Sequence, residues 1–304
     1  MQGGSGGEGL GFISSRKPDW LKVRAPGGPN YLRVKGLLKD LNLHTVCEEA
    51  RCPNTGECFG DLTATFLILG DICTRGCSFC AITHGRPAEL DPDESERVAR
   101  AVLSLGLRHV VITSVSRDDL EDGGAEVFAM TIKRIKELSP QSSIEVLVPD
   151  FKGSETALGK VLEAGPDILN HNLETVYRLY PLVRPGSKYG RSLQLLARAR
   201  RYGPCLLTKS GLILGLGEDW AEILQTMADL RGVSCDLLTL GQYLRPSHEH
   251  LPVIKYYHPE EFSELKALGE GMGFRHVESG PLVRSSYHAG WQARAAGRRS
   301  RVLA

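Results

Sequence analysis

Hydrophobic residues in the middle of the chain follow two alternating patterns, short apolar runs and longer stretches with helical spacing. Between residues 94 and 105, Val98, Ala101, Val102 and Leu105 recur at the spacing that places them on one helical face. The apolar run 63–69 ends in a glycine and predicts a strand. The whole pattern predicts strands at 63–69, 109–113, 144–148, 167–173, 206–214 and 236–240, and helices at 31–41, 94–105, 125–138, 155–164, 192–202, 221–230 and 259–268.

Six strand–helix units therefore follow one another from residue 63 to residue 268. Alternating units with short connections imply a parallel sheet built by right-handed crossovers. Six units favour an α/β fold with a partial (β/α)6 parallel barrel over a full eight-stranded barrel, and a doubly wound open sheet is the alternative. We expect an N-terminal extension at 1–60, the barrel at 61–272 and a C-terminal extension at 273–304.

Polar residues gather where the predicted strands end. The segments 114–119, 170–174 and 242–245 follow the second, fourth and sixth strands, and three cysteines follow the first. In parallel barrels, the residues that carry chemistry lie at the carboxyl ends of the strands. The sequence therefore predicts one site at that end of the barrel.

Charge and hydropathy exclude several classes of protein. The chain carries 37 Lys and Arg against 36 Asp and Glu, which argues against a dedicated nucleic-acid binder. No uncharged apolar run approaches the roughly 18 residues of a membrane span, and residues 1–12 lack the basic and apolar regions of a secretory signal. We expect a soluble, cytoplasmic protein without nucleic-acid or membrane partners.

Six of the eight cysteines lie between residues 47 and 80, and the other two, Cys205 and Cys235, are isolated. A disulfide scaffold is normally a short secreted chain with cysteines spread throughout it. A local cluster in a chain of 304 residues without a predicted signal instead favours metal ligation in a reducing compartment.

Cys73, Cys77 and Cys80, here called the barrel trio, have the spacing Cys-x3-Cys-x2-Cys and can hold three thiolates around one metal centre. Thiolates suit zinc and iron–sulfur clusters, but a structural zinc or a closed [4Fe–4S] cluster normally takes four protein ligands. Three ligands would leave one iron open to another molecule, which indicates catalysis. A zinc site or a closed cluster is the structural alternative.

Cys47, Cys52 and Cys58, here called the N-terminal trio, have a spacing that matches neither zinc fingers nor ferredoxins. Alone, this trio is moderate evidence for a second cluster that lacks one ligand. Cys205 or Cys235 could supply that ligand, but both lie in an apolar context, where we favour small buried hydrophobes.

The barrel trio, with Phe79 before its last cysteine, resembles the CxxxCxΦC motif that follows the first barrel strand in the radical S-adenosylmethionine (SAM) superfamily. Further segments are similar to the lipoyl synthase family, over roughly residues 17 to 290. These segments are CEEARCPNTGEC (47–58), GDICTRGCSFC (70–80), TSVSRDDLEDGG (113–124), NHNLETV (170–176), KSGLILGLGE (209–218) and GPLVRSSYHAG (280–290).

The resemblance implies two clusters. In that family the barrel trio holds a [4Fe–4S] cluster whose open iron binds SAM, and the N-terminal trio holds an auxiliary [4Fe–4S] cluster. The fourth ligand of the auxiliary cluster is the first serine of the RSSY motif, which Ser285 matches. An oxygen ligand is more exchangeable than a thiolate, so its iron can be released when the cluster is consumed as a sulfur source.

The implied activity is that of a sulfurtransferase. Radicals formed from SAM remove hydrogen from carbons 6 and 8 of an octanoyl chain, which is amide-linked to a lysine of a lipoyl carrier domain. The auxiliary cluster donates two sulfur atoms, and the product is the lipoyl cofactor. Because the cofactors carry the hard step, we assign no catalytic side chain.

Eight more residues are candidates for contacts with SAM on the strength of the resemblance. They are Gly123, Gly124, Asn172, Glu174, Arg184, Arg191, Gly215 and Gly217. We expect the glycines to approach SAM, the amide and carboxylate to bind ribose or amino groups, and the arginines to hold the SAM carboxylate or the carrier. Each could equally be a capping or surface residue, and His171 is interpreted as a packed strand-end histidine.

The implied partners are octanoylated lipoyl carrier domains of 2-oxoacid dehydrogenase E2 subunits and of the glycine cleavage H protein. A reductant such as flavodoxin or ferredoxin and an iron–sulfur carrier for cluster rebuilding are implied as well. A basic tail with Arg294, Arg298, Arg299 and Arg301 is either solvated or attracts an acidic carrier domain. Another sulfur-inserting radical SAM enzyme, or a non-catalytic metal protein, is the alternative class.

Overall fold

The computed structural model describes residues 17–23, 25–203 and 205–297. They contain one eight-stranded sheet whose order in space, β1 to β8, equals the order in the sequence. β1 pairs antiparallel with β2, and all other neighbouring strands are parallel. The strands are β1 (His44–Thr45), β2 (Thr65–Ile68), β3 (His109–Ser114), β4 (Ser143–Leu147), β5 (Ile168–Asn170), β6 (Leu207–Leu214), β7 (Leu237–Gln242) and β8 (His276–Gly280).

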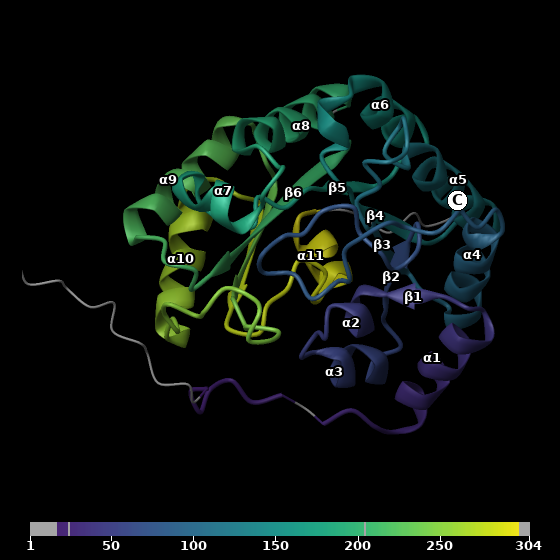
Figure 1. The fold of residues 1–304 in the computed structure, drawn as a ribbon, viewed down its shortest axis with the longest axis horizontal. Coiled ribbons are helices and arrows are strands. Elements are labelled where there is room, and N and C mark those ends of the chain that lie inside the picture. Colours follow the sequence, from purple (N-terminus) through teal and green to yellow (C-terminus); the bar gives the residue numbers. More distant parts are fainter. Residues whose placement is uncertain (1–16, 24, 204, 298–304) are drawn as a thin grey trace, which may run out of the picture.

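Helices cover the outside of the curved sheet (Figure 1). The helix α4 shows why they form there, because its buried Val98 and Val102 face inward and Gly106 ends it in the left-handed conformation, with φ 64°. The six helices that connect consecutive parallel strands are α4 (Glu94–Leu105), α5 (Ala125–Leu138), α6 (Glu155–Glu163), α8 (Tyr189–Tyr202), α9 (Trp220–Gly232) and α10 (Pro259–Gly271). All six predicted strand–helix units are therefore present.

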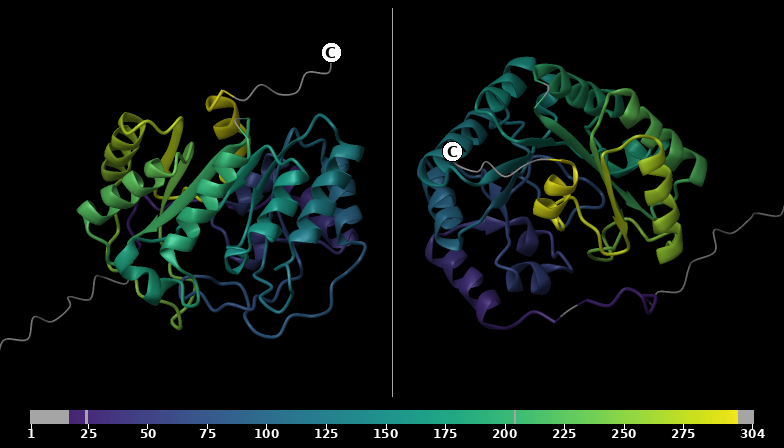
Figure 2. Two further views of the ribbon diagram at one scale, coloured as in Figure 1. Left: turned by 90° about the horizontal axis from the view of Figure 1, so that it is seen from above. Right: turned by 180° about the vertical axis from the view of Figure 1, so that it is seen from behind.

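The strand order distinguishes the two predicted architectures. A doubly wound sheet reverses its strand order at a switch point, whereas here each strand lies beside its predecessor from β1 to β8. The sheet curves into a partial barrel ringed by helices (Figures 1 and 2). The prediction of a partial parallel barrel is confirmed.

Several shorter elements are not predicted by the sequence pattern. β8 is polar and ends in glycine, and β1 has two residues, so neither shows a hydrophobic run. The predicted strand at 167–173 is shorter than expected, and the predicted helix at 31–41 begins earlier, as α1. The remaining elements are α1 (Pro29–Asp40), α2 (Val46–Glu49), α3 (Thr55–Gly60), the 3-10 turns η1 (Phe151–Gly153) and η2 (Tyr177–Leu179), α7 (Tyr180–Val183) and α11 (Ala289–Ala295).

The helix α11 lies inside the ring of strands, at the end where the parallel strands begin (Figure 2). Its Ala293 packs against Ile168, Leu207 and Leu237 from three strands. Further along the barrel interior, the ammonium of Lys209 lies 3.0 Å from the carboxylate of Glu145, and both side chains are fully buried. One end of the barrel is thus plugged, and the other end is left for the site.

β1 and β8 are the two edges of the sheet, and side chains bridge the seam between them. The amide of Asn54 donates to the carbonyl of Leu282 at 2.7 Å, and the hydroxyl of Tyr287 donates to Glu57 at 2.9 Å. The hydroxyl of Thr65 donates to that of Ser286 at 2.8 Å. These contacts hold the segment 281–288 against the segment that carries the N-terminal trio.

Two predictions concern the surroundings of the protein and its tail. No helix in the described ranges is long and apolar enough to cross a membrane. Arg294 belongs to α11, whereas Arg298, Arg299 and Arg301 lie outside the described residues. The boundaries of the three predicted domains stay predictions.

Candidate functional site

A cavity of about 670 Å³ opens at the carboxyl ends of the parallel strands. That volume is in the range of roughly 300–1,000 Å³ that small-molecule sites have. All six cysteines of the two trios line it, together with Ser285 and residues from the ends of β3, β4, β6 and β7. The prediction that the polar segments after the strands would meet in one place is correct.

The barrel trio lies in the loop between β2 and α4. Cys73 is held by backbone, because its N–H donates to Thr83 at 2.8 Å and its carbonyl accepts from Gly85 at 2.9 Å. The sulfur of Cys73 accepts the backbone N–H groups of Ser116, at 3.3 Å, and of Arg75, at 3.4 Å. Burial and the neighbouring thiols raise the pKa of Cys80 to about 12. Three half-buried thiols whose negative charges repel one another form a site that a bound cation stabilises.

The N-terminal trio lies on two short helices, with Cys47 in α2, Cys52 in the turn and Cys58 in α3. The hydroxyl of Thr55 fixes the turn by donating to the carbonyls of Cys47, at 3.0 Å, and Cys52, at 2.8 Å. Burial, and then the charge of Cys52, raises the pKa of Cys47 to about 12. Burial likewise raises the pKa of Cys58, with Cys47 and Cys52 adding to it. The second trio thus has the same electrostatic character as the first.

Ser285 reaches the cavity on the segment 281–288, which follows β8. This segment passes very close to β7 at Gly241, where an added Cβ would overlap the carbonyl oxygen of Val283. The glycine therefore permits the approach that brings Ser285 to the same cavity as the N-terminal trio. Its neighbour Arg284, which no pattern singled out beyond the RSSY motif, also lines the cavity and donates a hydrogen bond to the carbonyl of Val283.

Asn172, Glu174 and Arg184 form a polar wall of the cavity. The amide of Asn172 donates to Glu174 at 2.9 Å, and Arg184 donates to the Asn172 carbonyl at 2.6 Å. Burial raises the pKa of the Glu174 carboxyl, and the cation of Arg184 opposes that rise. Among the described residues, the Oδ1 of Asn172 and the Nε of Arg184 are buried without a hydrogen-bond partner. These two free groups fit a polar ligand such as SAM.

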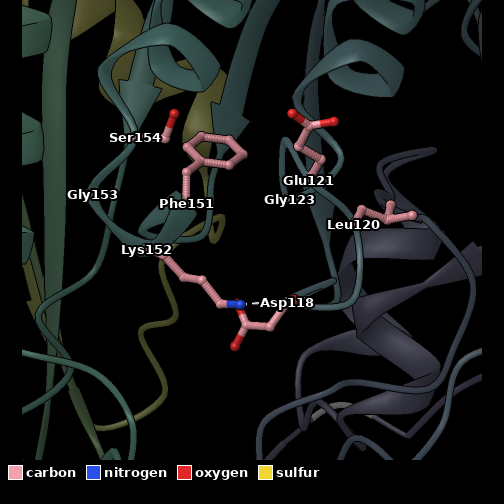
Figure 3. A pocket seen from close by; sticks show the side chains of 8 residues that line it. All are labelled: Asp118, Leu120, Glu121, Gly123, Phe151, Lys152, Gly153 and Ser154. Carbon is pink, nitrogen blue, oxygen red and sulfur yellow. Dashed lines mark hydrogen bonds between the residues drawn. The ribbon is translucent and has the colours of Figure 1, made fainter.

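The other five candidates for SAM contacts do not reach this wall. Gly123 lines a separate cavity of about 340 Å³ beside η1 (Figure 3). Gly124 packs tightly against Leu69, and Arg191 donates to Asp150 at 3.0 Å. The remaining two, Gly215 and Gly217, have φ values of 111° and 107° in the turn after β6. For all five residues, contact with SAM stays a prediction.

His171 and the two isolated cysteines lie outside the two trios. His171 lines the cavity, but its two ring nitrogens bond the Val148 carbonyl and the Ser192 hydroxyl, each at 2.8 Å. Burial lowers the pKa of His171 to about 4, so the ring is neutral. Cys235 is buried just before β7, as predicted, whereas Cys205, which precedes β6, is exposed, so the prediction of a buried hydrophobe is wrong for Cys205. Both lie where their strands begin, away from the cavity.

The donor set suits thiolate-bound clusters better than a single ion. In the described ranges, no three His, Cys, Asp or Glu side chains converge on the position of one metal ion. Each trio instead lines the shared cavity with three thiols whose charges affect one another's pKa. A [4Fe–4S] cluster takes thiolates on separate irons, so the residues present fit such a group at each trio.

Comparisons with known proteins agree with this arrangement. The family model of the radical SAM superfamily matches residues 67–230, and the model of the N-terminal domain of lipoyl synthase of the radical SAM family matches residues 11–52. Lipoyl synthase from Rubrobacter xylanophilus is 60% identical over 273 residues, which are 90% of this chain and 85% of that protein. Lipoyl synthase from Nitrosococcus oceani is 60% identical over 279 residues, or 91% of this chain and 86% of that one.

Solved structures share the fold at low sequence identity. A maturase of the [FeFe]-hydrogenase superposes with a TM-score of 0.54 at 16% identity, over 68% of this chain and 49% of its own. Methylornithine synthase superposes with a TM-score of 0.51 at 19% identity, over 67% of this chain and 60% of its own. This chain thus spans less than two thirds of those two proteins. At such low sequence identity, the likeness shows the fold alone.

The partial barrel, with a three-cysteine loop after its first parallel strand, defines a radical SAM enzyme. Within that class, the match of the N-terminal model and the 60% identity over nine-tenths of the chain point to one family. The chain belongs to the lipoyl synthase family. Membership in this family implies SAM and two [4Fe–4S] clusters as cofactors.

Proposed function

We propose that this chain inserts two sulfur atoms, at carbons 6 and 8, into an octanoyl group carried by the lysine of a lipoyl domain. The observation that carries the proposal is the single cavity that both cysteine trios and Ser285 line. A reaction that joins a carbon radical to a cluster sulfide needs its radical source and its sulfur source on the same enclosed space.

The residues divide between the two cofactor sites. The barrel trio would hold the SAM-binding cluster, and the N-terminal trio with Ser285 would hold the auxiliary cluster. When bound, SAM and the two clusters supply the hydrogen-abstracting radical and the sulfur. The chain itself binds and orients these groups, and the apolar side chains in the cavity lining, among them Leu67, Val148 and Ile213, keep water away from them.

The polar wall of the cavity is suited to binding SAM. The free Oδ1 of Asn172 can accept a hydrogen bond from an amino or hydroxyl group, and the free Nε of Arg184 can donate one to a carboxylate. Glu174, half-buried on the same wall, accepts the Asn172 amide and adds a further acceptor. Asn172, Glu174 and Arg184 are therefore our candidates for SAM contacts, ahead of the five residues outside the cavity.

The partners are proposed on family membership. The substrates are octanoylated lipoyl domains, with E2 subunits of 2-oxoacid dehydrogenases and the glycine cleavage H protein as carriers. A flavodoxin or ferredoxin would reduce the SAM-binding cluster, and an iron–sulfur carrier would rebuild the auxiliary cluster after use. Reaction with these proteins would take place in the cytoplasm.

The test is mass spectrometry of an octanoyl-lysine peptide after incubation with anaerobically reconstituted protein, SAM and a strong reductant. We expect a gain of two sulfur atoms with release of 5′-deoxyadenosine. Release of 5′-deoxyadenosine without sulfur gain would mean another radical SAM reaction, and neither product from a protein with both clusters would overturn the proposal.

The role of Ser285 has a matched control next to it. Ser285→Ala should still cleave SAM but should lose sulfur insertion, because only the auxiliary cluster loses a ligand. Ser286→Ala removes the neighbouring hydroxyl of the same segment, which bonds the hydroxyl of Thr65 and is not a proposed cluster ligand. If both variants insert sulfur equally, Ser285 is not the ligand.

A further inference from the structure

The side chain of Arg75, two residues after Cys73, lies between two carboxylates from other loops. Its Nε and Nη2 donate to the two oxygens of Asp118 at 2.7 and 2.8 Å, and Nη2 also donates to Asp150 at 2.6 Å. A fourth, longer contact joins Nη1 to the hydroxyl of Ser187 at 3.3 Å. The guanidinium thus ties the barrel trio's loop to the loops after β3 and β4 and to the turn before α8.

The two acceptors of Arg75 are held in place by other groups. Asp150 is buried, and its carboxylate also accepts the guanidinium of Arg191 at 3.0 Å and the backbone N–H of Lys152 at 3.1 Å. The ammonium of Lys152 donates to the carbonyl of Asp118 at 2.8 Å, as Figure 3 shows. The Asp150 carboxylate and the backbone of Asp118 therefore have partners besides Arg75, which reduces the ordering that the ion pairs require.

The turn after Asp150 is strained in a way that serves the same geometry. Phe151 and Lys152 both have positive φ, 45° and 51°, although neither is a glycine. Side chains rarely adopt this conformation, and it persists only where the surroundings enforce it. In this turn the Asp150 carboxylate pairs with Arg75 of the barrel trio's loop, and Lys152 reaches across to Asp118.

A second set of contacts joins the same two loops beside the cysteines. Thr74 donates to the carbonyl of Ser116 through both its hydroxyl, at 2.8 Å, and its N–H, at 3.0 Å. The N–H of Asp118 donates to the Thr74 hydroxyl at 3.0 Å, and the N–H of Ser116 donates to the sulfur of Cys73 at 3.3 Å. The ion pairs of Arg75 thus act on the segment whose backbone N–H groups bond the first cysteine.

We propose that Arg75 is a positioning residue that fixes the barrel trio's loop on the ends of β3 and β4. Its ion pairs with Asp118 and Asp150 place the three thiols before a cluster is bound. The inference rests on the proposed function only in taking the barrel trio as the ligands of a cluster. Partners that orient ligands contribute roughly 10–100-fold to metal affinity in comparable sites.

The test compares how long Arg75 variants retain an iron–sulfur cluster, in a background protein that can bind only one cluster. Replacing the N-terminal trio by alanine leaves the barrel trio as the sole cluster site, and about four irons per chain are expected after anaerobic reconstitution. In that background Arg75→Gln should lose its cluster to an iron chelator roughly 10–100-fold faster. Arg75→Lys, which keeps the charge but not the two-oxygen pairing, should fall between.

Arg198→Gln is the matched control. Arg198 also binds the loop after β4, through the Gly153 carbonyl at 2.9 Å, and pairs with Glu155 at 2.7 Å, but it does not contact the barrel trio's loop. It should lower thermal stability without changing the rate of cluster loss. If Arg198→Gln and Arg75→Gln lose the cluster equally fast, Arg75 serves the fold alone and the inference is wrong.

Two further outcomes separate this inference from the proposed function. A background protein that binds no iron with Arg75 intact would contradict the assignment of the barrel trio itself. A background protein that binds its cluster, together with an Arg75→Gln variant that retains it as long, would overturn only the role of Arg75. If Arg75→Gln does not fold, Asp118→Asn gives the same comparison from the partly exposed partner.

Discussion

Replacing Gly241 by alanine should disturb the auxiliary site without touching any of its proposed ligands. Gly241 lies in β7 and pairs in register with Gly280 of β8. A Cβ built there would overlap the carbonyl oxygen of Val283, lie 3.0 Å from its carbonyl carbon and lie 3.3 Å from the guanidinium of Arg284. The contact is with backbone, so no side-chain rotation can relieve it.

The size of the effect follows from this overlap. The added Cβ overlaps the Val283 carbonyl oxygen more deeply than its carbon, and heavy atoms pack best at about 3.5–4.0 Å. The Val283 carbonyl must therefore withdraw by more than about 1 Å, and Ser285 moves with it. Inserting a methyl group into a packed interior costs about 1–3 kcal/mol. If that energy is released when the segment 281–288 leaves the seam, its opening becomes about 5–150-fold more favourable.

The assay is iron loss from the auxiliary cluster, in a background whose barrel trio is replaced by alanine. Iron release to a chelator should be about 5–150-fold faster in Gly241→Ala, because the proposed serine ligand detaches more often. Gly280→Ala is the control from the paired strand, since its Cβ would meet only the side chain of Val283, at 3.4 Å. It should release iron at the rate of the background protein.

Equal iron release from both glycine variants would refute the reasoning. So would slower release from Gly241→Ala, because overlap with the segment 281–288 can only favour its departure. A change in iron release that also appears in a protein with the barrel trio alone would place the effect in the barrel and not in the seam.

Three further predictions concern the barrel interior and the seam. His171 has a folded pKa of about 4, below its unfolded value of about 6.5, so its contribution is complete above that unfolded value and is lost as the pH falls toward 4. Between pH 8 and 5.5 this amounts to about 1.4 kcal/mol, and urea unfolding of His171→Gln should show a correspondingly flatter pH profile. Lys209→Met removes the ammonium beside the buried Glu145 carboxylate, which keeps the Asn170 amide at 3.0 Å and the His109 ring at 3.4 Å. The loss of the ammonium should destabilise the fold by roughly 3–5 kcal/mol. Thermal unfolding is the measurement, and partial recovery in the double variant with Glu145→Gln is the check. Tyr287→Phe removes the hydrogen bond to Glu57 and should cost about 1 kcal/mol, seen as faster iron loss from the auxiliary cluster and contradicted by an unchanged rate.

Periodicity predicts the barrel well because its helices and strands are long enough to repeat their pattern. The bounds of α4 and α5 equal the predicted ranges, since each has a full apolar face and a glycine at one end. β8 and α2 are not predicted because β8 has only one apolar side chain, Val277, and α2 has only four residues, so neither shows a hydrophobic period. Their positions depend on contacts with distant parts of the chain, which local pattern cannot show.

The candidate site also has a part that local sequence predicts and a part that depends on the folded chain. Asn172 and Glu174 were predictable because they directly follow a strand, and position at a strand end is a local property. Arg191 was not, because its partner Asp150 becomes visible only when the loop after β4 folds back on α8. The cysteine spacings indicated two metal centres, but only the folded chain brings both trios to one cavity.

The seam between β1 and β8 also determines the order in which the two sets of cluster ligands are completed during synthesis. The barrel trio lies within eight consecutive positions, so its three thiols leave the ribosome almost together. The N-terminal trio and Ser285 meet only across contacts that join positions 230 residues apart. On the proposed assignment, the auxiliary cluster gains its full ligand set only after nearly the whole chain has been translated and the barrel has closed. On that assignment, loading of the auxiliary centre requires a finished fold, whereas the ligands proposed for the SAM-binding cluster are present early in synthesis.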